Sequence, residues 1–347
     1  MNCRTRMRSP LAAAAAVAFL SFAGFASEAS AHVKWFCAFD VAGQPRGLEN
    51  VLCADFEGLV GLAVLFLILG CLVDGTAPGD ALMRALNRVT SELQVNHEIL
   101  IRAVGGFFFV TLWSMEGILL TPELKTTAMW VPWLQLAIAA GLIWRRTMPL
   151  SGLGIVVLFA LAVREYGVFH LADYPVFLGL AAYLALVGLD RDLFGMRPLD
   201  VARYSAAVTL MWASIEKWAY PEWSFPLFVE HPSVTMGFDG EFFMRAAGVI
   251  EFTLAFSLMW TPLVRRMSAI VLAAMFVAAT FEFGKIDVIG HAPIVVVLLA
   301  IVGDDVAVVQ RTRGFAATVA LAYGVVLAGF LTAYYFAHAF LFGTQIL

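Results

Sequence analysis

Six ionisable residues in the second half of the chain lie within or beside apolar runs. They are Glu216, Lys217, Glu251, Glu282, Asp287 and His291. A charged side chain at the centre of a bilayer costs about 2.5–3.5 kcal/mol on insertion scales, so residues of this kind are candidates for function. Carboxylates and histidine exchange protons readily, because small changes in their surroundings move their pKa values. We therefore predict that these six side chains handle protons or orient a ligand.

The composition of the chain indicates that a membrane surrounds these residues. Of its 347 residues, 61% are hydrophobic and 14% are charged, whereas soluble domains have about 45–50% and about 25%. A water-soluble enzyme is thereby excluded, and the 29 Phe and 9 Trp exclude a disordered chain. A formal net charge of −4 provides no basic excess to hold nucleic acid. The lipid bilayer is the predicted main partner.

Ten apolar runs are long enough, or nearly so, to cross a bilayer as helices of about 17–25 residues. Strands are excluded because the runs are continuous rather than alternating, and an open sheet cannot satisfy its backbone in lipid. The predicted fold is all-α, a polytopic transmembrane helix bundle with nine or ten spans. The runs lie near residues 56–74, 99–121, 126–144, 149–165, 174–189, 203–220, 242–262, 266–284, 287–303 and 314–342.

The first 31 residues have the three parts of a secretory signal peptide. Three arginines precede the apolar stretch 11–25, and Ala29-Ser30-Ala31 supplies a small-residue cleavage site. Cleavage there leaves His32 as the mature N-terminus and residues 32–55 as a periplasmic segment. An uncleaved first helix is the alternative.

The distribution of arginine predicts the same orientation. Arg145-Arg146 and Arg265-Arg266 lie in short loops that fall on the cytoplasmic side when the mature N-terminus is periplasmic. Residues 56–98 then form the first span and a cytoplasmic amphipathic stretch, and residues 314–347 form the C-terminal span. The predicted location is the bacterial inner membrane.

Two segments of the chain repeat the same order of motifs. The matching positions are Trp113, Glu116, Arg145-Arg146, Glu165-Tyr166-Gly167 and Pro175 in residues 99–190, and Trp212, Glu216, Arg265-Arg266, Glu282-Phe283-Gly284 and Pro293 in residues 202–303. Both segments hold four apolar runs with the same starting side, which predicts two parallel four-helix repeats. The alternative is chance similarity between apolar helices.

The second repeat resembles the DoxX-like superfamily of four-helix membrane proteins. The resemblance is carried by Trp212–Pro221, Gly248–Glu251 and Phe283–Ile294. It implies a role in quinone-linked sulfur oxidation, or in maturation or redox partnership. The first repeat departs from this pattern, with Asp173 in the place of His291 and Gly117 in the place of Lys217. The second repeat is therefore the better candidate for a site.

The predicted topology gathers the ionisable residues on one side of the membrane. Most of them fall in the periplasmic third of their helices, and Glu251 lies nearer the midplane. We predict that the sixth to ninth spans converge on one pocket that contains Glu216, Glu251, Glu282 and His291, because these charges are too costly to face lipid. The alternative is that they reach the interface or form ion pairs between helices.

Three functions fit such a protein. An apolar pocket with a few carboxylates and a histidine suits proton-coupled chemistry of a lipid quinone. Electrons would then come from a membrane or periplasmic redox partner, because the sequence has no haem or flavin motif. The second function is copper binding through the amine and imidazole of an N-terminal His32, together with His231. The third is a transporter or scaffold without chemistry.

Two cysteines lie in the predicted periplasmic segment. Cys37 and Cys53 could close a loop of about 17 residues, worth roughly 3 kcal/mol in loop entropy, and the periplasm favours oxidation. We predict a disulfide between them, with free thiols or metal ligands as the alternatives. Cys71 lies within a predicted span, and we expect it to act as a small apolar residue.

Overall fold

The structure is a computed structural model that describes residues 33–307 and 315–346. The predicted signal peptide and His32 lie outside these residues. The described chain is all-α, as the continuous apolar runs predict. The long helices are α4 (Ala54–Asp74), α5 (Ala77–Val89), α6 (Ser91–Met115), α7 (Val131–Gly141), α8 (Met148–Tyr166), α10 (Pro175–Leu189), α11 (Pro198–Ala219), α13 (Gly240–Ser257), α14 (Pro262–Phe283), α15 (Lys285–Gly303) and α16 (Phe315–Phe342). The short helices include α2 (Val33–Phe36), α3 (Leu48–Val51), α9 (Val168–Leu171) and α12 (Phe225–Glu230).

Six helices of the described chain are long and apolar enough to span a membrane: α4, α6, α8, α14, α15 and α16. The chain is therefore a multi-pass membrane protein. The ten predicted spans are not confirmed. Helix α7 has 11 residues, about 16 Å at 1.5 Å per residue, which is roughly half the hydrocarbon core. Helix α10 has 15 residues.

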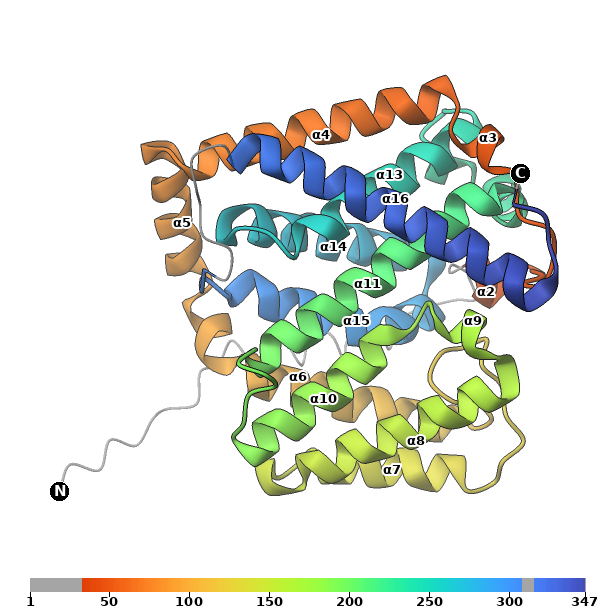
Figure 1. Ribbon diagram of the computed structural model, residues 1–347. Helices are drawn as coiled ribbons and strands as arrows, with labels where there is room; N and C mark the ends of the chain where they lie inside the picture. The colour runs from red at the N-terminus through yellow and green to blue at the C-terminus, as the bar shows by residue number, and fades with distance from the viewer. Residues whose placement is uncertain (1–32, 308–314, 347) are drawn as a thin grey trace.

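Eight helices form a closed ring. In the order α6, α7, α8, α10, α11, α13, α14 and α15, each helix packs against the next, and α15 packs against α6 to close the ring. Helices α4 and α16 pack against each other and against α13 and α11 on one side of the ring. Figure 1 shows these two helices crossing the top and front of the bundle. The ring encloses the space in which buried polar side chains can meet.

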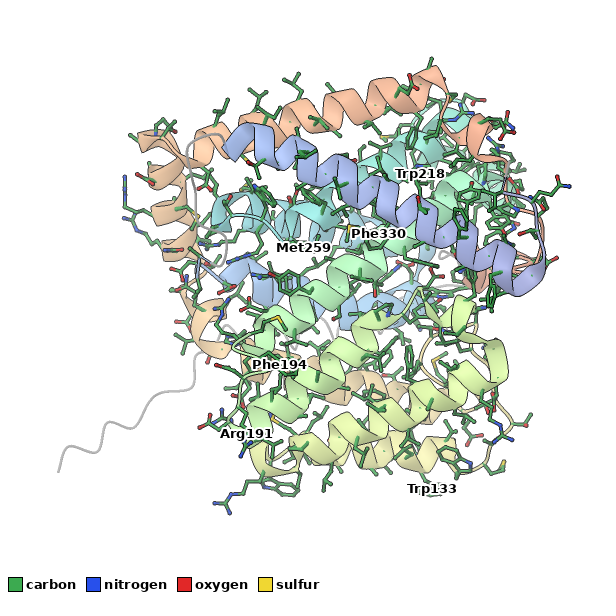
Figure 2. The ribbon with its side chains drawn as sticks, viewed as in Figure 1. Trp133, Arg191, Phe194, Trp218, Met259 and Phe330 are labelled. Atoms are coloured by element: carbon green, nitrogen blue, oxygen red, sulfur yellow. The ribbon has the colours of Figure 1, made fainter. Side chains whose placement is uncertain are left out.

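The outer surface of the bundle is apolar, as contact with lipid requires. Trp133 of α7 is 68% exposed and projects outward at the lower edge of Figure 2. Large apolar side chains such as Leu150 of α8 and Phe66 of α4 are likewise exposed. Trp218, by contrast, is buried in the interior. The bundle thus buries many polar side chains and exposes large apolar side chains on its outer surface.

The two ends of the bundle differ. Helices α2, α3 and α9 gather at one end, and α5 runs across the other end, at the left of Figure 1. The α5 end holds a buried ion network in which Asp304 pairs with Arg197 at 2.9 Å and with Arg265 at 3.0 Å, while Asp200 pairs with Arg203 at 3.0 Å. Burial alone would raise the pKa of Asp304, but the hydrogen bonds from Arg197 and the charge of Arg265 lower it below its ordinary value.

The run predicted at 99–121 ends earlier than expected. Helix α6 stops at Met115, because Glu116 and Gly117 both have positive φ angles, of 51° and 65°. The chain then turns inward, and the side-chain amide of Gln135 donates hydrogen bonds to the carbonyls of Ile118 and Leu119 at 2.6 and 3.1 Å. Those bonds satisfy two backbone carbonyl groups of a buried, non-helical segment. The apolar composition of this segment does not distinguish it from a helix.

Candidate functional site

A cavity of about 290 Å³ lies inside the ring, at the end where α2 is found. Its wall is formed mainly by α11, α14 and α15, with two residues each from α10 and α13, and α2 contributes Lys34 and Trp35. Most of the surface that lines the cavity is apolar. The polar groups are therefore few, and they fall into three separate clusters.

The first cluster centres on Lys34. Its ammonium group forms ion pairs with the carboxylates of Asp173 and Glu216, the latter at 2.7 Å. All three side chains are nearly inaccessible, with 2%, 5% and 12% of their surfaces exposed. Burial alone would lower the pKa of Lys34, but the two carboxylates raise it above its ordinary value. Lys34 is therefore a cation buried between two acids.

The second cluster pairs Asp287 with His291 on α15, one helical turn apart. The Nδ1 atom of His291 lies 3.0 Å from Oδ1 of Asp287, whose side chain is fully buried. Asp287 stands in the first turn of α15, where the helix dipole favours a negative charge. Gly284, with φ 79°, ends α14 and lets the chain turn directly into α15. The His291 ring stands 4.8 Å from that of Trp35 and 4.6 Å from that of Phe276.

The third cluster joins two ring helices. Lys217 of α11 contacts Glu251 of α13 at 2.7 Å, and both side chains line the cavity. The two helices approach closely because Gly248 has no side chain: a Cβ there would lie 2.3 Å from Nε1 of Trp218. The lysine thus supplies the counter-charge for a carboxylate inside the bundle.

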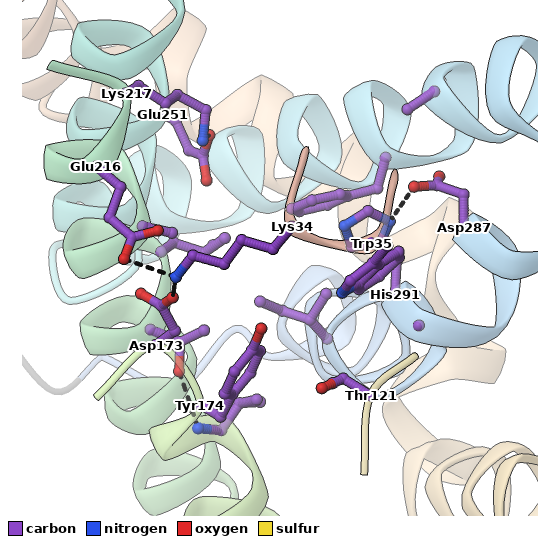
Figure 3. A pocket seen from close by; sticks show the side chains of 18 of the residues that line it. Lys34, Trp35, Thr121, Asp173, Tyr174, Glu216, Lys217, Glu251, Asp287 and His291 are labelled. Atoms are coloured by element: carbon purple, nitrogen blue, oxygen red, sulfur yellow. Dashed lines mark hydrogen bonds and ion pairs between the residues drawn. The ribbon is translucent and has the colours of Figure 1, made fainter. Parts of the chain in front are cut away.

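Figure 3 shows how the clusters face one another. Asp173 and Glu216 lie on one side of the cavity, His291 and Asp287 lie on the other, and Lys34 and Trp35 of α2 lie between them. The cavity therefore offers proton donors and acceptors on opposite walls, with aromatic rings between them.

The structure brings five of the six predicted site residues together around this cavity, namely Glu216, Lys217, Glu251, Asp287 and His291. Glu282 is not among the lining residues. Its carboxylate is 38% exposed and contacts His231 at 3.0 Å and Ser233 at 3.1 Å. The reason is that Glu282 lies in the last turn of α14, beside the loop that carries His231.

Further residues line the cavity that are not among the predicted site residues. Lys34 and Trp35 precede the first predicted span, and no feature of the sequence indicates that either is a site residue. Asp173 and Tyr174 also line the cavity, although the sequence favours the second repeat as the place of a site. A signal did exist for Asp173, because it stands where the second repeat has His291. No comparable pattern marks Lys34, since its partners lie 139 and 182 positions away.

A further acidic group adjoins the cavity. Glu123 accepts hydrogen bonds from the hydroxyls of Tyr174 and Thr121, both of which line the cavity. Nε2 of His170 lies 3.9 Å from the same carboxylate. The side chains of Glu123 and His170 are 3% and 5% exposed. This group extends the polar wall of the cavity toward the 116–130 loop.

The metal and disulfide predictions gain no support. His32 lies outside the described residues, and His231 is engaged by Glu282. Within residues 33–307 and 315–346, no group of three or more His, Cys, Asp or Glu side chains is placed to hold a metal ion. Cys37 and Cys53 are free thiols in the structure, and burial together with Glu230 raises the pKa of the Cys37 thiol. The Cys37–Cys53 bond therefore remains a prediction.

The fold and the cavity together describe a helical membrane protein with a mostly apolar cavity that a few charged side chains line. Comparisons of the chain with protein families, with characterised proteins and with solved structures find no match. The site must therefore be interpreted from its own chemistry.

Proposed function

We propose that this chain is a DoxX-like membrane protein that binds a quinone-type head group in the cavity and exchanges protons with it. One observation carries this proposal. A mostly apolar cavity of about 290 Å³ has the buried Lys34–Asp173–Glu216 cluster on one wall and the Asp287–His291 pair on the other.

The chemistry of the two walls suits such a ligand. A quinone has two carbonyl oxygens on opposite sides of a flat apolar ring. Lys34 can donate a hydrogen bond from one wall and His291 from the other, while Trp35 and Phe276 can pack against the ring. Glu216 and Asp287 lie beside these donors and can accept or replace their protons. We assign the electrons to a separate redox partner.

The arrangement of the helices supports the proposed repeats, number of spans and orientation in the membrane. The ring contains two successive sets of four helices, α6–α7–α8–α10 and α11–α13–α14–α15, as two parallel repeats would. We propose that all eight, with α4 and α16, cross or enter the bilayer. We place the α2 end in the periplasm of a bacterium, because the arginine-rich network then lies on the cytoplasmic side.

Titration of the purified protein with a short-chain ubiquinone analogue tests the binding. Trp35 and Trp223 line the cavity, so a bound quinone should quench tryptophan fluorescence. His291→Asn and Glu216→Gln should bind about 10-fold or more weakly. The first variant loses a donor to the quinone and the second loses a partner that positions Lys34, and a hydrogen bond to a charged group contributes about 1.5–3 kcal/mol. Glu282→Gln is the matched control, since Glu282 lies outside the cavity, and it should bind as the wild type does. Equal affinity in all four proteins, or no quenching, would reject the proposal.

A further inference from the structure

The surroundings of the Lys34 ammonium group have the features of a binding site for a cation. Two carboxylates, of Asp173 and Glu216, contact the nitrogen. The aromatic rings of Phe39 and Trp223 each lie 5.9 Å from it, within the range of cation–π attraction. The two rings also approach each other to 5.8 Å, so they form one corner of the same enclosure.

The enclosure contains more acidic groups than basic groups, and this balance favours a bound cation. Two acids face a single ammonium group, and within the described chain Lys34 is the basic residue that pairs with either of them. Asp173 is 95% buried by its side-chain surface, and its Oδ1 atom has no hydrogen-bond partner among the described residues. Removal of the lysine would leave two buried acids without their shared counter-charge, which is strongly unfavourable.

The segment that follows Lys34 is anchored by hydrogen bonds that do not involve the lysine side chain. The carbonyls of Gly43 and Arg46 accept hydrogen bonds from the hydroxyls of Tyr220 and Tyr335, at 2.9 and 2.7 Å. The backbone amide of Arg46 donates to the carbonyl of Ala219 at 2.9 Å. Shortening the Lys34 side chain should therefore empty the enclosure without releasing the segment that follows it.

We propose that Asp173 and Glu216, with the rings of Phe39 and Trp223, form a subsite for a primary alkylammonium group, and that Lys34 fills it as a tethered ligand. A free primary amine of matching length then occupies the subsite when the lysine is shortened. The inference does not depend on the quinone proposal, because it concerns the cation subsite alone.

Chemical rescue of a lysine variant tests this inference. Lys34→Ala removes the side-chain atoms from Cγ to Nζ, which together correspond to n-propylamine. The melting temperature of this variant in detergent should fall well below that of the wild type. Added n-propylamine, protonated at neutral pH, should recover most of that loss in a saturable manner. 1-Propanol, which has the same length but no charge, should recover none of it, and the wild type should not respond to the amine.

Two further variants complete the test. In Lys34→Ala/Asp173→Asn/Glu216→Gln the acids are neutral, so n-propylamine should give no more stabilisation than 1-propanol. Lys34→Leu keeps the apolar stem of the side chain as far as Cδ, so methylamine matches the missing atoms and should stabilise this variant where methanol does not. Equal effects of amine and alcohol on both lysine variants would overturn the proposal. So would full rescue of the triple variant, or a failure of both lysine variants to fold in the presence of amine.

Discussion

Lys34 shows most clearly how one residue can hold distant parts of this chain together. It belongs to a four-residue helix, yet its ammonium group bridges the start of α10 and the end of α11. A buried ion pair is not by itself a strong source of stability, but breaking one side of it leaves an uncompensated charge. The lysine is therefore expected to matter more for stability than its position near the N-terminus would indicate.

The first prediction concerns the ammonium group itself. Lys34→Met should lower the free energy of unfolding by about 3–5 kcal/mol, since Asp173 and Glu216 lose their shared counter-charge. Thermal or denaturant unfolding in mild detergent measures the loss. Lys125→Met is the control, because Lys125 is exposed and should change stability very little. A loss no larger than that of the control would show that the carboxylates are already neutral.

A matched pair of glutamates separates buried from exposed ion pairs. Glu251→Gln should destabilise the protein clearly, because Glu251 is 8% exposed and pairs with Lys217 inside the bundle. Glu282→Gln should cost less than about 1 kcal/mol, because exposed pairs contribute little. The same unfolding assay compares the two variants. Similar losses in both would contradict the placement of Glu251 and Glu282 in the structure.

At the scale of helices, the sequence predicts that a helix exists more accurately than it predicts where that helix begins and ends. Each of the ten apolar runs overlaps one of the long helices, because continuous apolar composition is a strong signal for helix in lipid. The run at 99–121 nevertheless ends in a buried loop after Met115, and α7 covers only Val131–Gly141 of the run at 126–144. Backbone angles at Glu116 and Gly117 decide the first case, and composition does not encode them.

The candidate site was predictable to the extent that its residues share one local pattern. Asp287 and His291 are one turn apart on α15, and Glu216 is in the last turns of α11, so periodicity and depth indicate a common face. Lys34 reaches the same place through contacts across most of the chain. Such long-range pairs leave no periodic trace in a single sequence.

The packing of α2 on α15 yields the third prediction. A Cβ at Gly290 would lie 1.9 Å from the ring of Trp35, so Gly290→Ala should displace α2 although alanine favours helix. Cys37 directly follows α2 and is a half-buried free thiol. Its alkylation, followed by peptide mass spectrometry, should become several-fold faster.

Gly324→Ala in α16 is the control, because a Cβ there meets nothing within 4 Å. Unchanged alkylation of Cys37 in Gly290→Ala would contradict the contact between α2 and α15. Absence of any alkylation without reductant would instead support the predicted Cys37–Cys53 bond.

The molecule as a whole has a mostly apolar cavity at one end and a largely buried ion network at the other. Asp304 links α15 to Arg197, before α11, and to Arg265 of α14. The network contains more arginines than carboxylates, and Arg203 and Arg265 are fully buried. This end therefore fixes the relative positions of the ring helices, while the opposite end holds the ligand-sized space.

The fourth prediction is the response of this network to acid. The pKa of Asp304 is lower in the folded protein than its ordinary value of 3.8, so the unfolded chain binds more protons near that pH. The stabilisation is present above about pH 4 and is lost as pH falls through the folded pKa. Unfolding midpoints of the wild type between neutral and acid pH should fall more steeply than those of Asp304→Asn. Parallel curves would contradict the role of Asp304.

Photolabelling with a light-activated quinone analogue tests the central claim most directly. The reconstituted protein is labelled, digested, and its modified peptides are identified by mass spectrometry. The proposed site predicts labels on the cavity-lining parts of α11 and α15, around Glu216 and His291, and their loss when excess unlabelled quinone competes. Labels confined to the lipid-facing surfaces of α4, α7 and α16, without competition, would contradict it.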